Sequence, residues 1–237
     1  MRLDKYLTEM GMGSRSEVKL GIRKGFAKVN EKTVTRPEFK VSDKDSVLWK
    51  GTPVTYVEYE YIMLNKPAGV VSATEDSREK TVIELIQDRR RKDLFPVGRL
   101  DLDTEGLLLI TNDGDLAHRL LSPKKHVDKV YYARCRGTVR EGAAEEFARG
   151  IRLPDGLLCL PAELTVLSYD RIQDESEIRL RIREGKFHQV KRMMEAAGCP
   201  VLFLKRLSMG PLVLDETLKP GEYRPLTDTE REWLEQL

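Results

Sequence analysis

Two carboxylates in one short polar stretch are the most chemically suggestive feature of the sequence. Asp101 and Asp103 lie in a stretch that Gly106 closes, directly before the apolar run 107–110. Such a run predicts a buried strand, and a loop held by a rigid strand is a common place for reactive groups. Arg99 is close enough in sequence to favour the ionised form of Asp101. Spacing alone nevertheless favours an ordinary acidic turn before a strand.

The residues around these carboxylates resemble a known catalytic motif. Residues 98–108 read Gly-Arg-Leu-Asp-Leu-Asp-Thr-Glu-Gly-Leu-Leu, which is similar to the motif of RNA pseudouridine synthases, specifically the small-subunit rRNA family of the RsuA type. In that family the Asp that follows Gly-Arg-Leu is the essential carboxylate. The resemblance therefore implies that Asp101 is catalytic and that Arg99 contacts the substrate.

Further motifs of the same family follow in order. Asn65-Lys66-Pro67 precedes Gly69, and we expect this motif to shape the backbone because Pro and Gly form turns. The resemblance of Lys129-Val130-Tyr131 implies that Tyr131 stacks on the target base, since a base taken out of its stack needs a new stacking surface. An isolated strand tyrosine is more often a core residue. In the last motif Leu204, or its neighbour Leu207, would form part of the wall of a uracil pocket.

Residues 184–194 carry the third motif and predict a strand, a tight turn and a helix. The resemblance implies that the first basic residue after the turn glycine, Lys186, pairs with the catalytic Asp. Arginine is frequent at this place in the family, and lysine keeps the charge but loses the bidentate fork. We expect Lys191 and Arg192 at the edge of the cleft as phosphate contacts. His188 is either a general base or a structural residue at the helix start, and the structural interpretation is favoured.

The first fifty residues form a basic module. They carry a net charge of +5, whereas the whole chain carries +2, and this asymmetry suggests a module that binds a polyanion. The apolar spacing within residues 3–10 predicts a first helix. Ser14 and Glu17 match a capping box that opens a second helix. Residues 27–34 predict a hairpin that turns at Asn30-Glu31.

The second helix places Arg15, Lys19 and Arg23 on one face. Aligned cations suit a phosphate backbone, although a solvated helix face is an equally good interpretation. The motifs at residues 2–7, 14–16 and 25–30 resemble the S4 RNA-binding domain. That resemblance implies a set of RNA contacts: Arg2, Arg15, Ser16, Lys19, Arg23 and Lys24.

The apolar spacing of Thr81–Arg91 predicts a helix, which would end in a run of four cations at residues 89–92. These cations are either a solvated helix end or an RNA contact. The first interpretation is favoured because cations at a helix C-terminus complement the helix dipole.

The predicted fold is α+β. A small S4-like RNA-binding domain at residues 1–48 and a linker at 49–58 precede a pseudouridine synthase catalytic domain at 59–237, built on a mixed, mostly antiparallel sheet.

Hydrophobic residues make up 40% of the chain, which supports a packed core. No apolar run approaches the ~20 residues of a membrane span, and the N-terminus lacks the apolar region of a signal peptide. The three cysteines show no metal-ligand or disulfide spacing. We therefore expect a cytoplasmic protein.

The implied reaction is isomerisation of a uridine in 16S rRNA to pseudouridine. The resemblance implies no metal and no organic cofactor, 16S rRNA or a pre-30S particle as the partner, and a monomeric enzyme that does not bind membranes. A 23S rRNA synthase of the same family and a non-catalytic rRNA-binding assembly factor remain as alternatives. A hydrolase of glycosidic bonds is more distant because it would need a second, acidic carboxylate, for which Asp103 is the nearby candidate.

Overall fold

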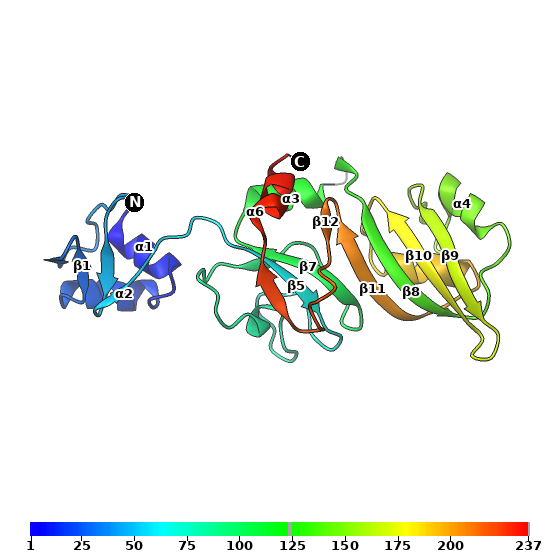
Figure 1. The fold of residues 1–237 in the computed structure, drawn as a ribbon, viewed down its shortest axis with the longest axis horizontal. Helices are drawn as coiled ribbons and strands as arrows, with labels where there is room; N and C mark the ends of the chain where they lie inside the picture. Colours follow the sequence, from blue (N-terminus) through cyan, green and yellow to red (C-terminus); the bar gives the residue numbers. More distant parts are fainter. Residues whose placement is uncertain (123–124, 237) are drawn as a thin grey trace. The chain divides into compact units, whose positions relative to one another are not determined.

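The computed structural model describes residues 1–122 and 125–236 and divides the chain into two units (Figure 1). The first unit holds Met1–Glu60 and Gln87–Leu94, and the second holds Tyr61–Ile86 and Phe95–Leu237. The segment 49–58, expected as a linker, lies in the first unit. The elements of this unit are α1 (Leu3–Glu9), α2 (Arg15–Arg23), β1 (Ala27–Val29), β2 (Lys32–Val34), β3 (Val47–Trp49) and β4 (Thr52–Pro53).

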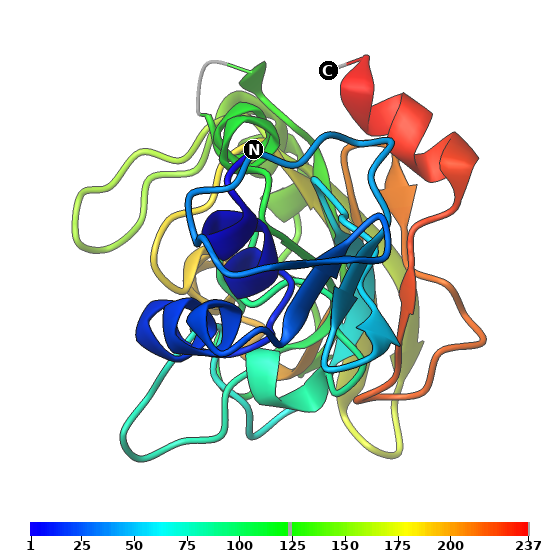
Figure 2. The ribbon, with the colours of Figure 1, turned by 90° about the vertical axis from the view of Figure 1, so that its left-hand side faces the viewer.

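The first unit packs two helices against a small antiparallel sheet of order β2-β1-β3-β4 (Figure 2). Its core joins apolar residues of both helices, such as Leu7 and Ile22, to Trp49 of β3. The capping box is confirmed, because the Ser14 N–H donates to Glu17 Oε2 at 2.7 Å and the Glu17 N–H donates to Ser14 Oγ at 3.3 Å. The predicted hairpin also forms. Its turn has positive φ at both central residues, as in the tight turns that match strand twist.

The predicted helix over residues 81–91 is wrong. A single 3-10 turn, η1 (Ile83–Leu85), forms there, and Gln87–Leu94 belongs to the first unit. The reason is a buried anchor: Arg91 Nη1 lies 3.2 Å from Glu9 Oε2, and Arg91 bonds Asp93 through two nitrogens at 2.8 and 2.6 Å. The Glu60 carboxylate accepts the backbone N–H groups of residues 90 and 91. These tertiary bonds take the place of helical ones, so the solvated helix end does not exist.

The second unit is built on one mixed sheet of order β13-β5-β7-β11-β8-β10-β9, with β12 on β11 and β6 on β7. The pair β7–β11 is parallel and the other pairs are antiparallel, which confirms the predicted mixed, mostly antiparallel α+β fold. The strands are β5 (Tyr61–Lys66), β6 (Phe95–Pro96), β7 (Glu105–Thr111), β8 (Lys129–Arg136), β9 (Glu163–Asp170), β10 (Glu175–Ile182), β11 (Val201–Met209), β12 (Leu212–Val213) and β13 (Tyr223–Pro225).

Four helices accompany this sheet within the described residues: α3 (Gly114–Leu121), α4 (Ala143–Arg149), α5 (Gln189–Ala196) and α6 (Asp228–Glu235). The apolar run Leu107–Ile110 is fully buried in β7, as the sequence predicted. None of the described helices is long and apolar enough to cross a membrane.

Gly106 allows β7 and β11 to approach closely. It pairs with Arg206, its φ is +104°, and a Cβ placed on it would lie 2.2 Å from the Arg206 carbonyl oxygen. A side chain of any size would therefore collide with the backbone of the neighbouring strand. Gly106, the glycine that follows the Gly-Arg-Leu-Asp sequence by five residues, thus holds the loop that carries Asp101 beside β11.

Candidate active site

A buried lysine, Lys66, fixes the loop that carries Asp101. Lys66, at the end of β5, donates from Nζ to the carbonyl oxygens of Asp101 at 3.0 Å and Thr104 at 2.9 Å, and also to Pro67 at 3.0 Å. The Thr104 N–H in turn donates to the Asp101 carbonyl at 3.1 Å. The Asn-Lys-Pro motif therefore positions the loop through its backbone carbonyls.

Two further contacts hold the same loop. The Gly69 N–H donates to the Leu102 carbonyl at 2.8 Å, and the Ser72 hydroxyl donates to the Leu100 carbonyl at 2.9 Å and accepts the Leu100 N–H at 3.0 Å. Backbone groups at residues 100, 101, 102 and 104 are thus all tied to the β5 end and the segment after it. A loop held at so many points presents its carboxylate without further ordering.

Lys66 also places a positive charge next to the backbone of the acidic loop. Burial lowers its pKa from the ordinary 10.5 to about 8, and the negative charges of Asp103, Asp101 and Glu105 oppose that shift. Since a pKa of about 8 lies above neutral pH, the group is an ammonium at pH 7. An ammonium can donate to several carbonyl oxygens at once, which is the arrangement observed.

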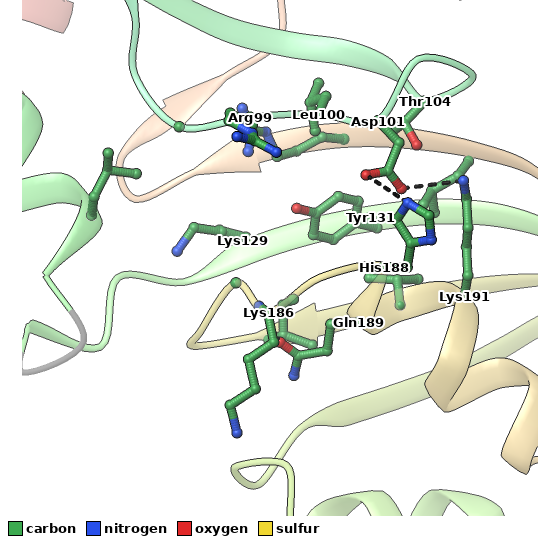
Figure 3. A pocket seen from close by; sticks show the side chains of 17 residues that line it. Arg99, Leu100, Asp101, Thr104, Lys129, Tyr131, Lys186, His188, Gln189 and Lys191 are labelled. Carbon is green, nitrogen blue, oxygen red and sulfur yellow. Dashed lines mark hydrogen bonds and ion pairs between the residues drawn. The ribbon is translucent and has the colours of Figure 1, made fainter. Parts of the chain in front are cut away.

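The carboxylate of Asp101 faces Lys191 and His188, both from the start of α5 (Figure 3). Lys191 Nζ lies 3.2 Å from Asp101 Oδ2 and 2.6 Å from Asp103 Oδ1, and His188 Nε2 lies 3.6 Å from Asp101 Oδ1. Burial alone would lower the pKa of Lys191, but its bonds to the two carboxylates raise it. The Asp101 side chain keeps 28% of its surface exposed, so the carboxylate remains accessible to a ligand.

Asp101 stands at the edge of a cavity of about 140 Å³. A cavity of ~150 Å³ in another protein holds one benzene molecule, so this space suits a single six-membered ring such as a pyrimidine. Tyr131 of β8, which is 7% exposed, and Leu204 of β11 line it, as do Ile182 and Val190. Figure 3 shows the Tyr131 ring below the Asp101 carboxylate. The structure thus brings together Asp101, Tyr131 and Leu204.

The expectation that Lys186 pairs with Asp101 is contradicted by the structure. Lys186 lines the cavity, but its Nζ lies 3.0 Å from Glu184 Oε2 and donates to the Leu158 carbonyl at 2.9 Å. Figure 3 shows this side chain pointing away from Asp101. The turn before α5 explains the difference. Its backbone bends through His188 at φ +48°, so Lys191, in the first helical turn, is the cation that faces the carboxylates.

The other predicted contacts are placed as follows. Arg99 lines the cavity and is exposed. Arg192 lies on the same helix as Lys191 and pairs with Asp155. In the first unit the cations of α2 are exposed or half-buried, and Arg2 forms two bonds to the buried carboxylate of Asp4.

Two buried cations in the cavity wall, Arg206 and Lys129, were not predicted as site residues from the sequence. Arg206 of β11 donates from Nε to the Leu107 carbonyl at 2.8 Å, and Lys129 of β8 donates to the Val127 carbonyl at 3.3 Å. Burial lowers the pKa of Lys129, and the neighbouring Arg206 lowers it further. Lys129 precedes Tyr131 by two residues in a strand, so the alternation of side chains was a signal that both face the cavity.

The fold and this site define a class of RNA-modifying enzyme. Residues 60–196 match the family model for RNA pseudouridylate synthase, and residues 1–47 match the S4 domain. The chain belongs to the RNA pseudouridylate synthase family, whose members are isomerases.

Individual relatives cover nearly the whole chain. The chain is 47% identical to an uncharacterized RNA pseudouridine synthase of Bacillus subtilis, YtzG, over 97% of this chain and 96% of that protein. It is 42% identical to the ribosomal small subunit pseudouridine synthase A of Vibrio cholerae, over 97% of both proteins. A crystal structure of a pseudouridylate synthase superposes with a TM-score of 0.68 at 37% identity, and the match covers 99% of both chains.

Proposed function

We propose that this protein isomerises a specific uridine in the 16S RNA of the small ribosomal subunit to pseudouridine, with Asp101 as the catalytic carboxylate. The observation that carries the proposal is the position of Asp101, partly exposed and held by Lys191 at 3.2 Å, at the edge of a cavity sized for one pyrimidine ring. The choice of RNA is supported by relatives that are named for the small ribosomal subunit and are 38–42% identical to this chain.

The proposed chemistry requires little besides these residues. Asp101 either attacks C1′ of the target uridine or removes the proton at C2′, and in both cases the bond from C1′ to N1 breaks. The freed uracil turns within the cavity and rejoins C1′ through C5. In the first route this step breaks the bond between Asp101 and C1′, and in the second route Asp101 returns the proton to C2′. The C5 proton then leaves and N1, which carried no proton in uridine, gains one, so that product and substrate have the same composition. Lys191 holds Asp101 in place, and Tyr131 stacks on the base and assists removal of the C5 proton.

The remaining parts of the proposal concern the whole chain. An S4-like part at residues 1–48 binds RNA through the cations of α2, a segment at 49–58 joins it to the rest, and residues 59–237 carry the catalytic site. The proposed enzyme acts as a monomer. An enzyme that modifies 16S rRNA or a pre-30S particle would act where ribosomes assemble, in the cytoplasm.

The test is pseudouridine mapping of total rRNA from cells with and without the gene, and from cells that carry Asp101→Asn. Loss of one small-subunit site in both the deletion and the variant supports the proposal. Loss of a large-subunit site would overturn the choice of RNA while keeping the reaction. An unchanged map would favour a non-catalytic assembly factor. Equal loss of RNA affinity and of product in purified Asp101→Asn would contradict the catalytic assignment.

A further inference from the structure

An exposed aromatic ring stands beside the candidate active site. Phe187, in the turn before α5, has 72% of its surface exposed. Burial of apolar surface stabilises a fold, so a ring left this open contributes little to it. The Phe187 side chain is therefore not explained by packing in the core.

The ring of Phe187 is stacked on that of His188. The two ring centroids are 3.8 Å apart and their planes differ by 18°. His188 lines the cavity, and its Nε2 lies 3.6 Å from Asp101 Oδ1. Phe187 is thus the outer ring of a two-ring stack whose inner ring faces the catalytic carboxylate.

The backbone of this turn supports the stack. His188 has φ +48° and ψ +32°, a left-handed conformation that is uncommon for residues other than glycine and that clusters at ligand sites. The adjoining Lys186 N–H is held by Gln189 Oε1 at 3.0 Å, and Gln189 Nε2 donates to Glu184 Oε1 at 2.7 Å. The turn is therefore fixed by Gln189, which follows the two rings in sequence, and by Glu184, which precedes them.

We propose that the free face of Phe187 stacks on the nucleobase next to the target uridine and so supports the opened RNA strand at the mouth of the cavity. This inference rests on the proposed function. Removing a uridine from its stack also exposes the face of a neighbouring base, and an aromatic side chain can cover that face. The Phe187–His188 pair is called the stacking platform below. Within it, Phe187 contacts the base and His188 is the positioning residue that supports Phe187.

The first test uses substrate RNA containing the uridine that the mapping experiment identifies, with single-turnover kinetics over a range of enzyme concentrations. Stacking on an aromatic side chain changes affinity by roughly 5- to 150-fold per base. We expect Phe187→Ala to raise the half-saturating enzyme concentration within that range and to change the maximal rate less than twofold. Phe187→Trp should retain wild-type affinity, whereas Phe187→Leu should lose it although it remains apolar. Ile172→Ala, at a position 96% exposed in the β9–β10 turn, is the matched control and should have no effect.

The second test identifies the base. RNAs with an abasic nucleotide on the 5′ or the 3′ side of the target uridine are compared in wild type and Phe187→Ala. At one of the two positions, loss of the base should weaken wild-type binding strongly and Phe187→Ala binding much less, because both changes remove the same contact.

Several outcomes would overturn the proposal that the stacking platform contacts a nucleobase. One is equal effects of the abasic nucleotides in both proteins at both positions. Another is full affinity in Phe187→Leu, which would indicate plain apolar contact. A third is a loss of maximal rate without loss of affinity. A wild-type enzyme that is inactive on the mapped RNA would instead count against the proposed function, so the two failures are distinguishable.

Discussion

Replacing Lys191 by Met tests which cation serves Asp101, the proposed catalytic carboxylate. The substitution removes an ammonium 3.2 Å from Asp101 Oδ2 and 2.6 Å from Asp103 Oδ1 while keeping an unbranched side chain of similar length. A hydrogen bond to a charged group contributes about 1.5–3 kcal/mol. Because Lys191 and Asp101 are 25% and 28% exposed, screening by solvent favours the lower end of that range. We therefore expect the single-turnover rate constant to fall by about tenfold or more.

The comparison with Lys186→Met makes the result decisive. Lys186 bonds Glu184 and the Leu158 carbonyl and does not contact Asp101, so its loss should change the rate less than threefold. The assay is release of tritium from C5-labelled uridine in 16S RNA, with thermal unfolding as the check that each variant folds. Lys191→Arg keeps the charge and should recover part of the rate. A greater loss in Lys186→Met than in Lys191→Met would refute the geometry described here.

Three further substitutions test the supporting structure. Lys66→Met removes the ammonium donor from the buried Thr104 carbonyl, whereas the Asp101 carbonyl keeps the Thr104 N–H, and should lower the free energy of unfolding in urea by about 1–3 kcal/mol. Because the folded protein releases the Lys66 proton near pH 8 and the unfolded chain near 10.5, wild-type stability should rise relative to the variant between these values. Gly106→Ala should prevent stable folding, since its Cβ would lie 2.2 Å from the Arg206 carbonyl oxygen, as measured by soluble yield and thermal unfolding. Lys19→Gln with Arg23→Gln should lower the slope of log affinity against log salt by roughly 1.4 for single-stranded RNA.

Two of these substitutions have a matched control, and Lys66→Met has a pH dependence that can refute it. A stability difference between wild type and Lys66→Met that stays flat from pH 8 to 10.5 would contradict the buried ammonium. Gly114→Ala, at a helical glycine whose added Cβ meets nothing within 4 Å, should be tolerated. Equal effects at Gly106 and Gly114 would contradict the close approach of β7 and β11. Lys32→Gln, in the exposed hairpin, should leave the salt slope unchanged.

Local patterns predicted much of the fold. The capping box of α2, the hairpin of β1 and β2 and the buried run in β7 each depend on residues near one another in the chain, and each forms as expected. The helix predicted over residues 81–91 failed for the opposite reason. Arg91 finds Glu9, a residue 82 positions earlier, and no local pattern records such a partner.

The sequence by itself determined the class of enzyme, the order of its motifs, and the placement of Tyr131 and Leu204 at one cavity with Asp101. These placements came from the resemblance of the motifs to a known family, since spacing alone favoured an acidic turn at Asp101 and a core position for Tyr131. Only the tertiary structure decided that Lys191 rather than Lys186 faces Asp101, and that Lys66 serves the loop through backbone carbonyls. The physical reason is that Lys186 and Lys191 lie on opposite sides of a turn whose direction depends on one left-handed residue, His188. The partners of Lys66 are backbone carbonyl groups. Every residue has such a group, so no residue type in the sequence predicts these bonds.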